Sequence, residues 1–115
     1  MILAIVDDLL FSSKIKTTAN HLRVDVTFAR SADAALALMR KSAPTLAIVD
    51  LDSARTDPLG TVAAMKRDPA LASIPIVGFV SHVHADLIDA ARAAGVDVMA
   101  RSAFTGQLAD ILQRA

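Results

Sequence analysis

The stretch Leu46-Ala47-Ile48-Val49-Asp50 decides how this chain folds. Four apolar residues follow one another without a polar break, and a carboxylate ends the run. An uninterrupted apolar run of this length is typical of a strand that is buried on both faces in the middle of a parallel sheet. In such sheets the functional groups lie at the carboxyl ends of the strands. Asp50 is therefore a candidate functional residue.

Four further segments have the pattern of strands. Residues 2–6 form a second continuous apolar run, which ends on Asp7-Asp8, and residues 76–80 form a third. Residues 24–28 and 96–99 instead alternate between apolar and polar side chains. Alternation indicates a strand that is covered more completely on one face, as at the edge of a sheet.

Between these strands the apolar residues follow the helical period. A serine at position 31 is a plausible helix N-cap, a glycine at position 95 a helix stop, and Asp68-Pro69 a helix end. The pattern predicts helices over residues 9–22, from Ser31 to about Ser42, from Gly60 to Asp68, over about 85–94, and after a cap at Thr105.

Strict alternation of strands and helices predicts an α/β fold, (βα)5, with a doubly wound parallel sheet. If the two alternating strands are the edges and the crossovers are right-handed, the strand order is 2-1-3-4-5. A length of 115 residues allows one domain over 1–115. The topological switch point then lies between the first and third strands, which places Asp7, Asp8 and Asp50 around one crevice.

Composition excludes several classes of protein. Twelve basic and twelve acidic residues give a net charge of zero, so nothing points to binding of nucleic acid or of an acidic membrane. The absence of Cys excludes disulfides and thiolate metal sites and fits a reducing compartment. The first apolar run is too short for a membrane span and has no basic leader. We expect a soluble, cytoplasmic domain.

Three clustered carboxylates need a compensating charge, because they repel one another. A hard divalent cation such as Mg²⁺ supplies it, since this ion takes oxygen ligands from one or two carboxylates, from carbonyls and from water. A carboxylate beside such an ion can act as a nucleophile toward phosphorus and form an aspartyl-phosphate. The alternative is that these aspartates only form turns and cap helices.

Several motifs support the first interpretation, and they occur in order along the chain: Ile5-Val6-Asp7-Asp8, Val49-Asp50-Leu51, Pro75-Ile76-Val77, Ala93-Ala94-Gly95-Val96-Asp97 and Phe104. With them the whole chain resembles a response-regulator receiver domain of two-component signalling, which has a flavodoxin-like fold. The resemblance implies that Asp50 is the phosphoacceptor in a phosphorelay, supplied by a histidine kinase or a phosphotransfer protein. We expect a signalling domain and not an enzyme.

The resemblance also implies a metal site and a partner surface. Mg²⁺ would be bound by Asp8 directly, by Asp7 through water, by Asp50, and by the backbone carbonyl of Asp52. A downstream protein partner is implied, with the face of the fourth helix, fifth strand and fifth helix as the candidate contact. A homodimer, the identity of the kinase and the presence of further domains stay open.

The chain departs from the family pattern where the phosphoryl group is normally sensed. Val80 stands at the position of the usual Thr or Ser, and Ser81 beside it is expected on the other face of the strand. Met99 replaces the aromatic switch residue and Ser102 the usual Lys. Arg101 carries a charge one position early, on the wrong face unless the strand end bulges. We expect metal binding to survive, phosphorylation to be impaired, and the switch to be weak in this atypical receiver.

The sequence is also compatible with three other interpretations. A pseudo-receiver, which acts as an interaction module without phosphorylation, is favoured by the lost Thr and Lys. Asp50-Leu51-Asp52 also fits a phosphatase of the haloacid-dehalogenase type, but that family needs a longer chain. The segment 82–86, with two His and one Asp, has the ligand spacing of a metallohydrolase. A polar loop that opens the next helix explains this segment more simply.

Overall fold

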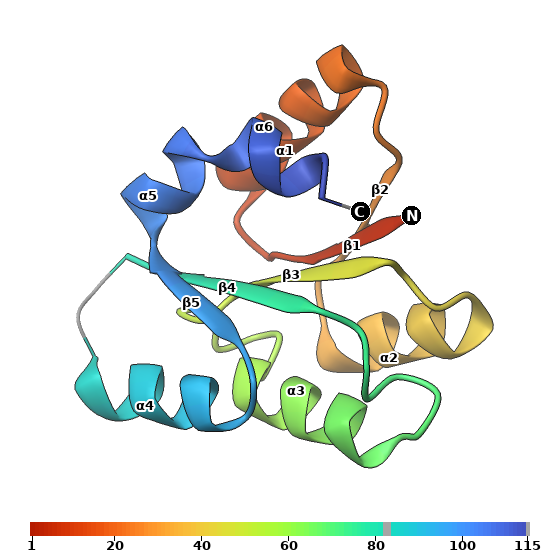
Figure 1. Ribbon diagram of the computed structural model, residues 1–115, viewed down its shortest axis with the longest axis vertical. Helices are drawn as coiled ribbons and strands as arrows, with labels where there is room; N and C mark the ends of the chain where they lie inside the picture. The colour runs from red at the N-terminus through yellow and green to blue at the C-terminus, as the bar shows by residue number, and fades with distance from the viewer. Residues whose placement is uncertain (82–83, 115) are drawn as a thin grey trace.

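Five parallel strands form one sheet in the order β2-β1-β3-β4-β5, as Figure 1 shows. The structure is a computed structural model that describes residues 1–81 and 84–114. The predicted order of the strands is therefore confirmed. The strands are β1 (Ile2–Ile5), β2 (Val26–Ala29), β3 (Leu46–Asp50), β4 (Ile76–Val80) and β5 (Asp97–Ala100).

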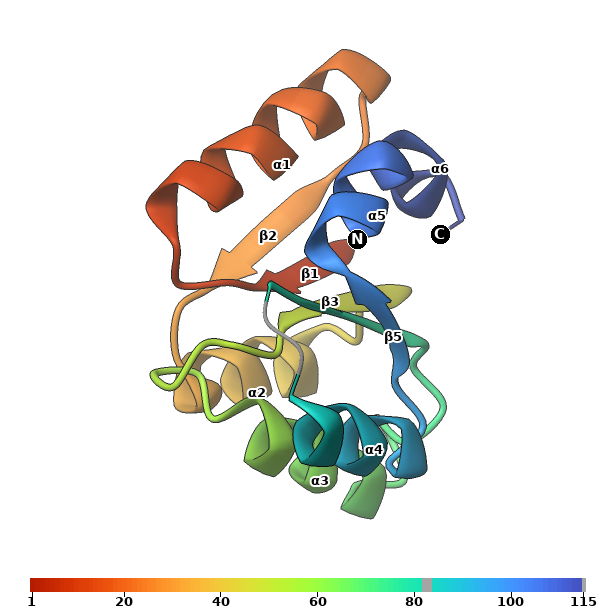
Figure 2. The ribbon, with the colours of Figure 1, turned by 90° about the vertical axis from the view of Figure 1, so that its left-hand side faces the viewer.

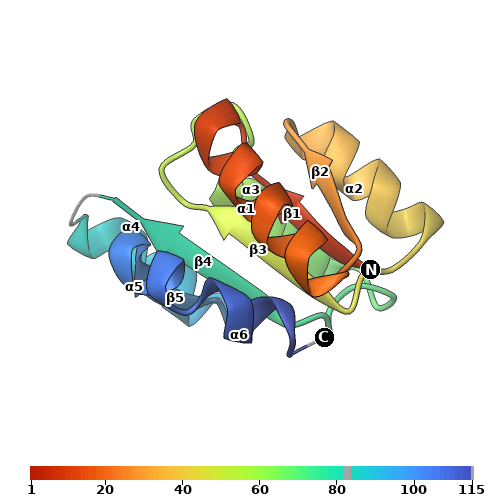
Figure 3. The ribbon, with the colours of Figure 1, turned by 90° about the horizontal axis from the view of Figure 1, so that it is seen from above.

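Helices connect the strands, and two more follow the last strand. They are α1 (Leu9–Leu22), α2 (Ala32–Lys41), α3 (Pro58–Arg67), α4 (Ala85–Ala93), α5 (Arg101–Gly106) and α6 (Leu108–Leu112). In Figure 2, α1, α5 and α6 cover one face of the sheet, and α2, α3 and α4 cover the other. Figure 3 looks onto the first of these faces, where α1 crosses in front of the sheet. Among the described residues, none of the helices is both long enough and apolar enough to cross a membrane.

The burial of each strand follows its sequence pattern. All residues of β1, β3 and β4 are buried, whereas β2 is mostly half-buried and β5 is half-buried in its middle and exposed at both ends. Continuous apolar runs therefore became central strands, and alternating runs became edges. Each face of the sheet has its own apolar core, one closed by α2, α3 and α4 and the other by α1, α5 and α6.

Two predicted helix boundaries were wrong. Helix α3 begins at Pro58 and not at Gly60, because Asp57 is its N-cap and accepts a hydrogen bond from the Gly60 amide at 3.3 Å. Proline suits this first position, where its fixed φ matches the helix and no amide partner is needed. The last helical region begins at Arg101 and is divided at Gln107 into α5 and α6, so Thr105 lies inside α5 and caps nothing.

Candidate functional site

Three carboxylates lie at one edge of the sheet, where β1 and β3 end. Asp50 is the last residue of β3, and on β1 the pairing of Ile5 with Val49 is followed by Val6 and then by Asp7 and Asp8. The crossovers from β1 and β3 leave in opposite directions, since β2 lies on one side of this pair and β4 on the other. The structure therefore places Asp7, Asp8 and Asp50 at the topological switch point, as predicted.

Asp50 is nearly buried, with 8% of its surface exposed. Its Oδ1 accepts a hydrogen bond from the backbone amide of Asp52 at 3.0 Å. Burial raises the pKa of the Asp50 carboxyl above its ordinary value, although the amide of Asp52 opposes this shift. The negative charges of Asp52 and Asp8 raise it further, and the positive charge of Arg101 partly opposes them. A negative charge on Asp50 is therefore costly unless a cation compensates it.

Asp8 is in the opposite situation, because every partner favours its anion. As the N-cap of α1 it accepts hydrogen bonds at Oδ1 from the amides of Leu10 at 2.9 Å and Phe11 at 3.1 Å. Its Oδ2 accepts a hydrogen bond from Nη2 of Arg101 at 3.2 Å. The Phe11 amide, followed by Arg101 and the Leu10 amide, lowers the pKa of Asp8 against the effect of burial. Asp8 is both a helix cap and one half of an ion pair.

Arg101 reaches the acidic edge because β5 ends before it. The strand stops at Ala100 and α5 begins at Arg101, so the alternation of side chains along a strand does not apply to this residue. The sequence placed Arg101 on the wrong face unless the strand end bulges; the strand instead ends before Arg101, so that assumption of a continuing strand does not hold. Its guanidinium carbon lies 4.2 Å from the ring centre of Phe11, in a cation–π contact. Phe11 in turn packs against Phe79 and Phe104, which ties Arg101 to the core.

Asp7 is paired with two arginines that the sequence analysis missed. Nε of Arg30 lies 3.4 Å from its Oδ1, and Nε of Arg55 lies 3.6 Å from its Oδ2. Oδ1 is nevertheless a buried oxygen that accepts no hydrogen bond within the described residues. Arg30 directly follows β2, which ends at the same edge of the sheet as β1. The sequence could therefore have predicted that Arg30 lies near Asp7. Arg55 lies in an irregular loop, where the sequence carries no such signal.

Asp52 binds the segment that follows β4. Its Oδ2 accepts hydrogen bonds from both the backbone amide and the hydroxyl of Ser81, the latter at 2.7 Å. Ser81 lies just beyond the end of β4, while Val80 is the buried last residue of that strand. This contact joins the loop after β3 to the loop after β4. The hydroxyl of Ser81 is thus engaged with Asp52. The next residue, His82, lies outside the described residues.

The other switch positions lie close to the same edge. Met99 is half-buried in β5, and Ser102 is exposed in α5. A surface hollow of about 580 Å³ adjoins the acidic edge and is lined by Phe11, Lys14, Val80, Ser81, Ala100, Arg101, Ser102 and Thr105. Three predicted switch positions, Val80, Ser81 and Ser102, therefore face one hollow.

The oxygen atoms at this edge are of the kind that a hard divalent cation binds, and the unpartnered Oδ1 of Asp7 is a suitable ligand atom. In the part of the chain that the structure describes, however, no three acidic or imidazole side chains are close enough together to hold an ion. Arginines compensate the charges of Asp7 and Asp8 instead. Mg²⁺ needs only one or two carboxylates, since water completes its shell. Coordination by Asp7, Asp8, Asp50 and the carbonyl of Asp52 stays a prediction.

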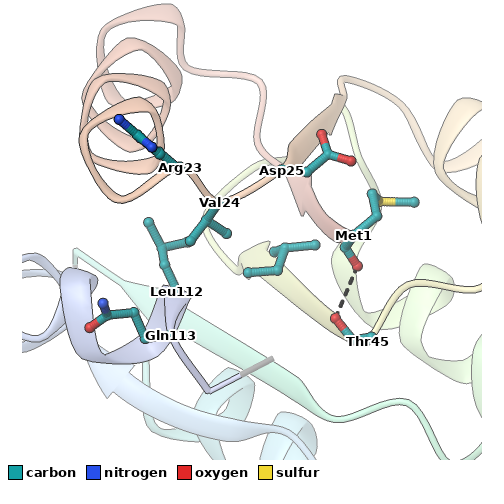
Figure 4. Close-up of a pocket in the computed structure, with 8 residues that line it drawn as sticks. Met1, Arg23, Val24, Asp25, Thr45, Leu112 and Gln113 are labelled. Atoms are coloured by element: carbon teal, nitrogen blue, oxygen red, sulfur yellow. Dashed lines mark hydrogen bonds between the residues drawn. The ribbon is translucent and has the colours of Figure 1, made fainter.

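A second hollow, of about 600 Å³, lies at the opposite edge of the sheet, where the strands begin. Figure 4 shows it between the chain before β2, the start of β1 and the end of α6. Its wall includes Thr45, whose hydroxyl donates to the carbonyl of Met1 at 3.1 Å. The carboxylate in its lining, Asp25, is exposed. Since functional groups of this fold lie at the other edge, this hollow is not our candidate site.

The sequence matches no model of a known protein family, and it matches no curated protein. Solved structures, however, match it over almost its whole length. The phosphorylated cyanobacterial phytochrome response regulator RcpA is 26% identical, with a TM-score of 0.82 over 98% of this chain and 88% of its own. The chemotaxis response regulator CheY4 of Vibrio cholerae is 19% identical, with a TM-score of 0.84 over 98% and 95%.

The Mn²⁺-bound form of the response regulator Rcp1 is similar to the same extent. It is 20% identical, with a TM-score of 0.81 over 96% of this chain and 89% of its own. These neighbours are consistently response regulators or their receiver domains. The chain therefore has the receiver-domain fold, a flavodoxin-like sheet with the strand order 2-1-3-4-5.

Proposed function

We propose that this chain is a receiver domain of two-component signalling in which Asp50 accepts a phosphoryl group from a histidine kinase or a phosphotransfer protein. The observation that carries the proposal is the position of Asp50, a nearly buried carboxylate at the switch point of a receiver fold with Asp7 and Asp8 beside it. The neighbour RcpA is known in a phosphorylated form.

In the proposed reaction an oxygen of the Asp50 carboxylate attacks the phosphorus of a phosphohistidine. A P–O bond forms, the P–N bond breaks, and the imidazole nitrogen keeps the electron pair and takes a proton from solvent. Asp7 and Asp8 would hold Mg²⁺, which offsets the charge of the phosphoryl oxygens when it is bound. The neighbour Rcp1 is known with bound Mn²⁺.

The proposed switch is weak, because the groups that sense a phosphoryl group are replaced. Val80 offers no hydroxyl, and the hydroxyl of Ser81 is engaged with Asp52. A hydrogen bond to a charged group is worth about 1.5–3 kcal/mol. Moving a two-state equilibrium from 1:99 to 99:1 takes about 5.5 kcal/mol, so the loss of such contacts leaves little driving force. We also propose that the protein acts in the cytoplasm. Any response to phosphorylation would reach a downstream partner through the α4–β5–α5 face.

The test is to expose the protein and an Asp50→Asn variant to acetyl phosphate, with Mg²⁺ and with EDTA. We expect intact mass spectrometry to show one added phosphoryl group in the wild type with Mg²⁺ and none in the variant. A wild type that gains no phosphoryl group at saturating donor would exclude the proposed function. Equal labelling of the variant would exclude Asp50 as the acceptor.

A second candidate function is a pseudo-receiver that binds a partner without being phosphorylated. The pairing of Asp7 with Arg30 and Arg55, and of Asp8 with Arg101, favours it, since arginines already compensate the acidic pair. The same experiment separates the two candidates. A pseudo-receiver gives no phosphoryl product, and its backbone amide NMR spectrum does not change when beryllofluoride is added with Mg²⁺.

A further inference from the structure

Both oxygens of the Asp8 carboxylate already have partners. Oδ1 accepts hydrogen bonds from the backbone amides of Leu10 and Phe11 and so caps α1. Oδ2 accepts a hydrogen bond from Nη2 of Arg101. The two hydrogen bonds at Oδ1 belong to the first turn of α1, and the helix keeps them when its end stays folded. Of the two oxygens, Oδ2 is therefore the one that a cation can take, and Arg101 holds it at 3.2 Å.

Arg101 is held in place better than the other arginines of the site. Its side chain is 36% exposed, against 54% for Arg30 and 70% for Arg55. Its guanidinium also contacts the ring of Phe11, which is part of the core. A planar guanidinium can stack on an aromatic ring and pair with a carboxylate at the same time. Arg101 therefore loses little additional side-chain entropy when it pairs with Asp8.

We infer that Arg101 and a divalent cation compete for Oδ2 of Asp8, so that Arg101 sets the affinity of this edge for the cation and leaves Asp8 when the cation binds. Two positive groups cannot share one carboxylate oxygen without strong repulsion. The inference rests on the proposed function only in taking this edge of the sheet as a divalent-cation site. It does not require Asp50 to be phosphorylated.

The experiment measures Mn²⁺ affinity by calorimetry in the wild type, in Arg101→Gln and in Arg114→Gln. Arg114 is the matched control, since it pairs with Asp97 at 3.7 Å, away from the acidic edge. A partly exposed charge pair is worth up to about 1 kcal/mol, which corresponds to roughly a fivefold change in affinity. We expect Arg101→Gln to bind Mn²⁺ about threefold to fivefold more tightly than the wild type, and Arg114→Gln to bind as the wild type does.

The Asp8→Asn background separates competition from a general effect of charge. If Arg101 acts by occupying Asp8, removing it changes nothing once the carboxylate is gone. If Arg101 repelled the cation through space, Arg101→Gln would still raise affinity in Asp8→Asn. We therefore expect no further gain in the double variant, and a gain equal to that in the wild-type background would overturn the inference.

A second measurement uses the unchanged protein and so does not depend on the folding of a variant. The Nε–H resonance of Arg101 is followed by NMR while Mg²⁺ is added, with that of Arg114 as reference. We expect the Arg101 resonance to shift with the same saturation as the backbone amides near Asp50. An unmoved resonance while Mg²⁺ binds, or no binding of Mg²⁺ or Mn²⁺ by any variant, would overturn the inference. Neither result decides whether Asp50 is phosphorylated, which the acetyl phosphate experiment tests separately.

Discussion

Two aspartates at the same edge of the sheet differ in how the protein treats their charge. Asp8 accepts two helix amides and an arginine, so the folded protein favours its anion. Asp50 is nearly buried and receives one backbone amide, so the folded protein disfavours its anion. The pKa of Asp8 is lowered and the pKa of Asp50 is raised as a result. The charged form of Asp50 is therefore the costly one, and a bound cation or protonation of the carboxyl would relieve that cost, whereas the charged form of Asp8 is already stabilised by its partners.

The raised pKa of Asp50 predicts a stabilised Asp50→Asn variant. The folded state holds the Asp50 proton more tightly than the unfolded chain does, so this contribution to stability is present below the unfolded pKa of about 3.9 and is lost as the pH rises through the folded pKa. We expect Asp50→Asn to melt at a higher temperature than the wild type at pH 7 in EDTA. The difference should vanish at low pH, where the carboxyl is neutral in both states.

Asp8→Asn is the matched control for this measurement, because asparagine is an equally good N-cap. The pKa of Asp8 is lowered, so its contribution is present above about pH 3.9 and is lost as the pH falls through the folded pKa. The control should therefore lower the melting temperature at pH 7. An Asp50→Asn variant no more stable than the wild type at pH 7 would contradict the role given to burial.

At the scale of an element, β4 depends on a residue without a side chain. A Cβ on Gly78 would lie 2.8 Å from Cγ1 of Val96 and 2.9 Å from Cδ1 of Leu51. All three residues belong to or border the sheet, and Val96 and Leu51 are buried. Leu51 directly follows Asp50, so the close approach at Gly78 lets the chain after β3 pack down beside the candidate site.

We expect Gly78→Ala to lower the free energy of unfolding by about 1–3 kcal/mol, because neither neighbour can move without disturbing the core. Gly106→Ala is the matched comparison at the end of α5. An added Cβ there meets nothing within 4 Å, and alanine favours the helix by up to about 1 kcal/mol. Urea unfolding of the two variants measures both changes. A Gly78→Ala variant as stable as Gly106→Ala would show that the core relaxes around the methyl group.

At the scale of the whole molecule, one sheet separates two cores. Alternate residues of β1 and β3 enter one core or the other, so both cores share the same backbone. These two strands are hydrogen-bonded on both sides, whereas β2 and β5 pair on one side only. The centre of the sheet therefore opens only when both cores are lost.

This arrangement predicts the order of amide exchange with solvent. We expect the amides of β1 and β3 to exchange most slowly, at the rate set by global unfolding, and those of β2 and β5 to exchange faster through local opening. Native-state hydrogen exchange followed by NMR measures each strand separately. Protection in β2 equal to that in β3 would contradict the prediction and indicate that the edge opens only with the centre.

The sequence by itself determined the elements, their order and the edge that carries the carboxylates. Continuous and alternating apolar runs distinguish central strands from edges, and right-handed crossovers then leave few arrangements. Because parallel strands end at the same edge, the sequence alone places Asp7, Asp8 and Asp50 together. The start of α3 was not predicted correctly because its cap, Asp57, lies before the apolar pattern begins. The start of α5 was missed because no capping side chain marks it, since the helix follows Ala100 directly.

Only the tertiary structure decided which partners the carboxylates have. Arg101 meets Asp8 because β5 ends at Ala100, one residue beyond the predicted strand, and the chain turns directly into α5. Arg55 meets Asp7 from an irregular loop, and Ser81 meets Asp52 from beyond the end of β4. Each pairing joins loops far apart in sequence, and its geometry depends on the last residue of a strand. Periodicity carries no information at that point, since it describes the interior of an element and not its end.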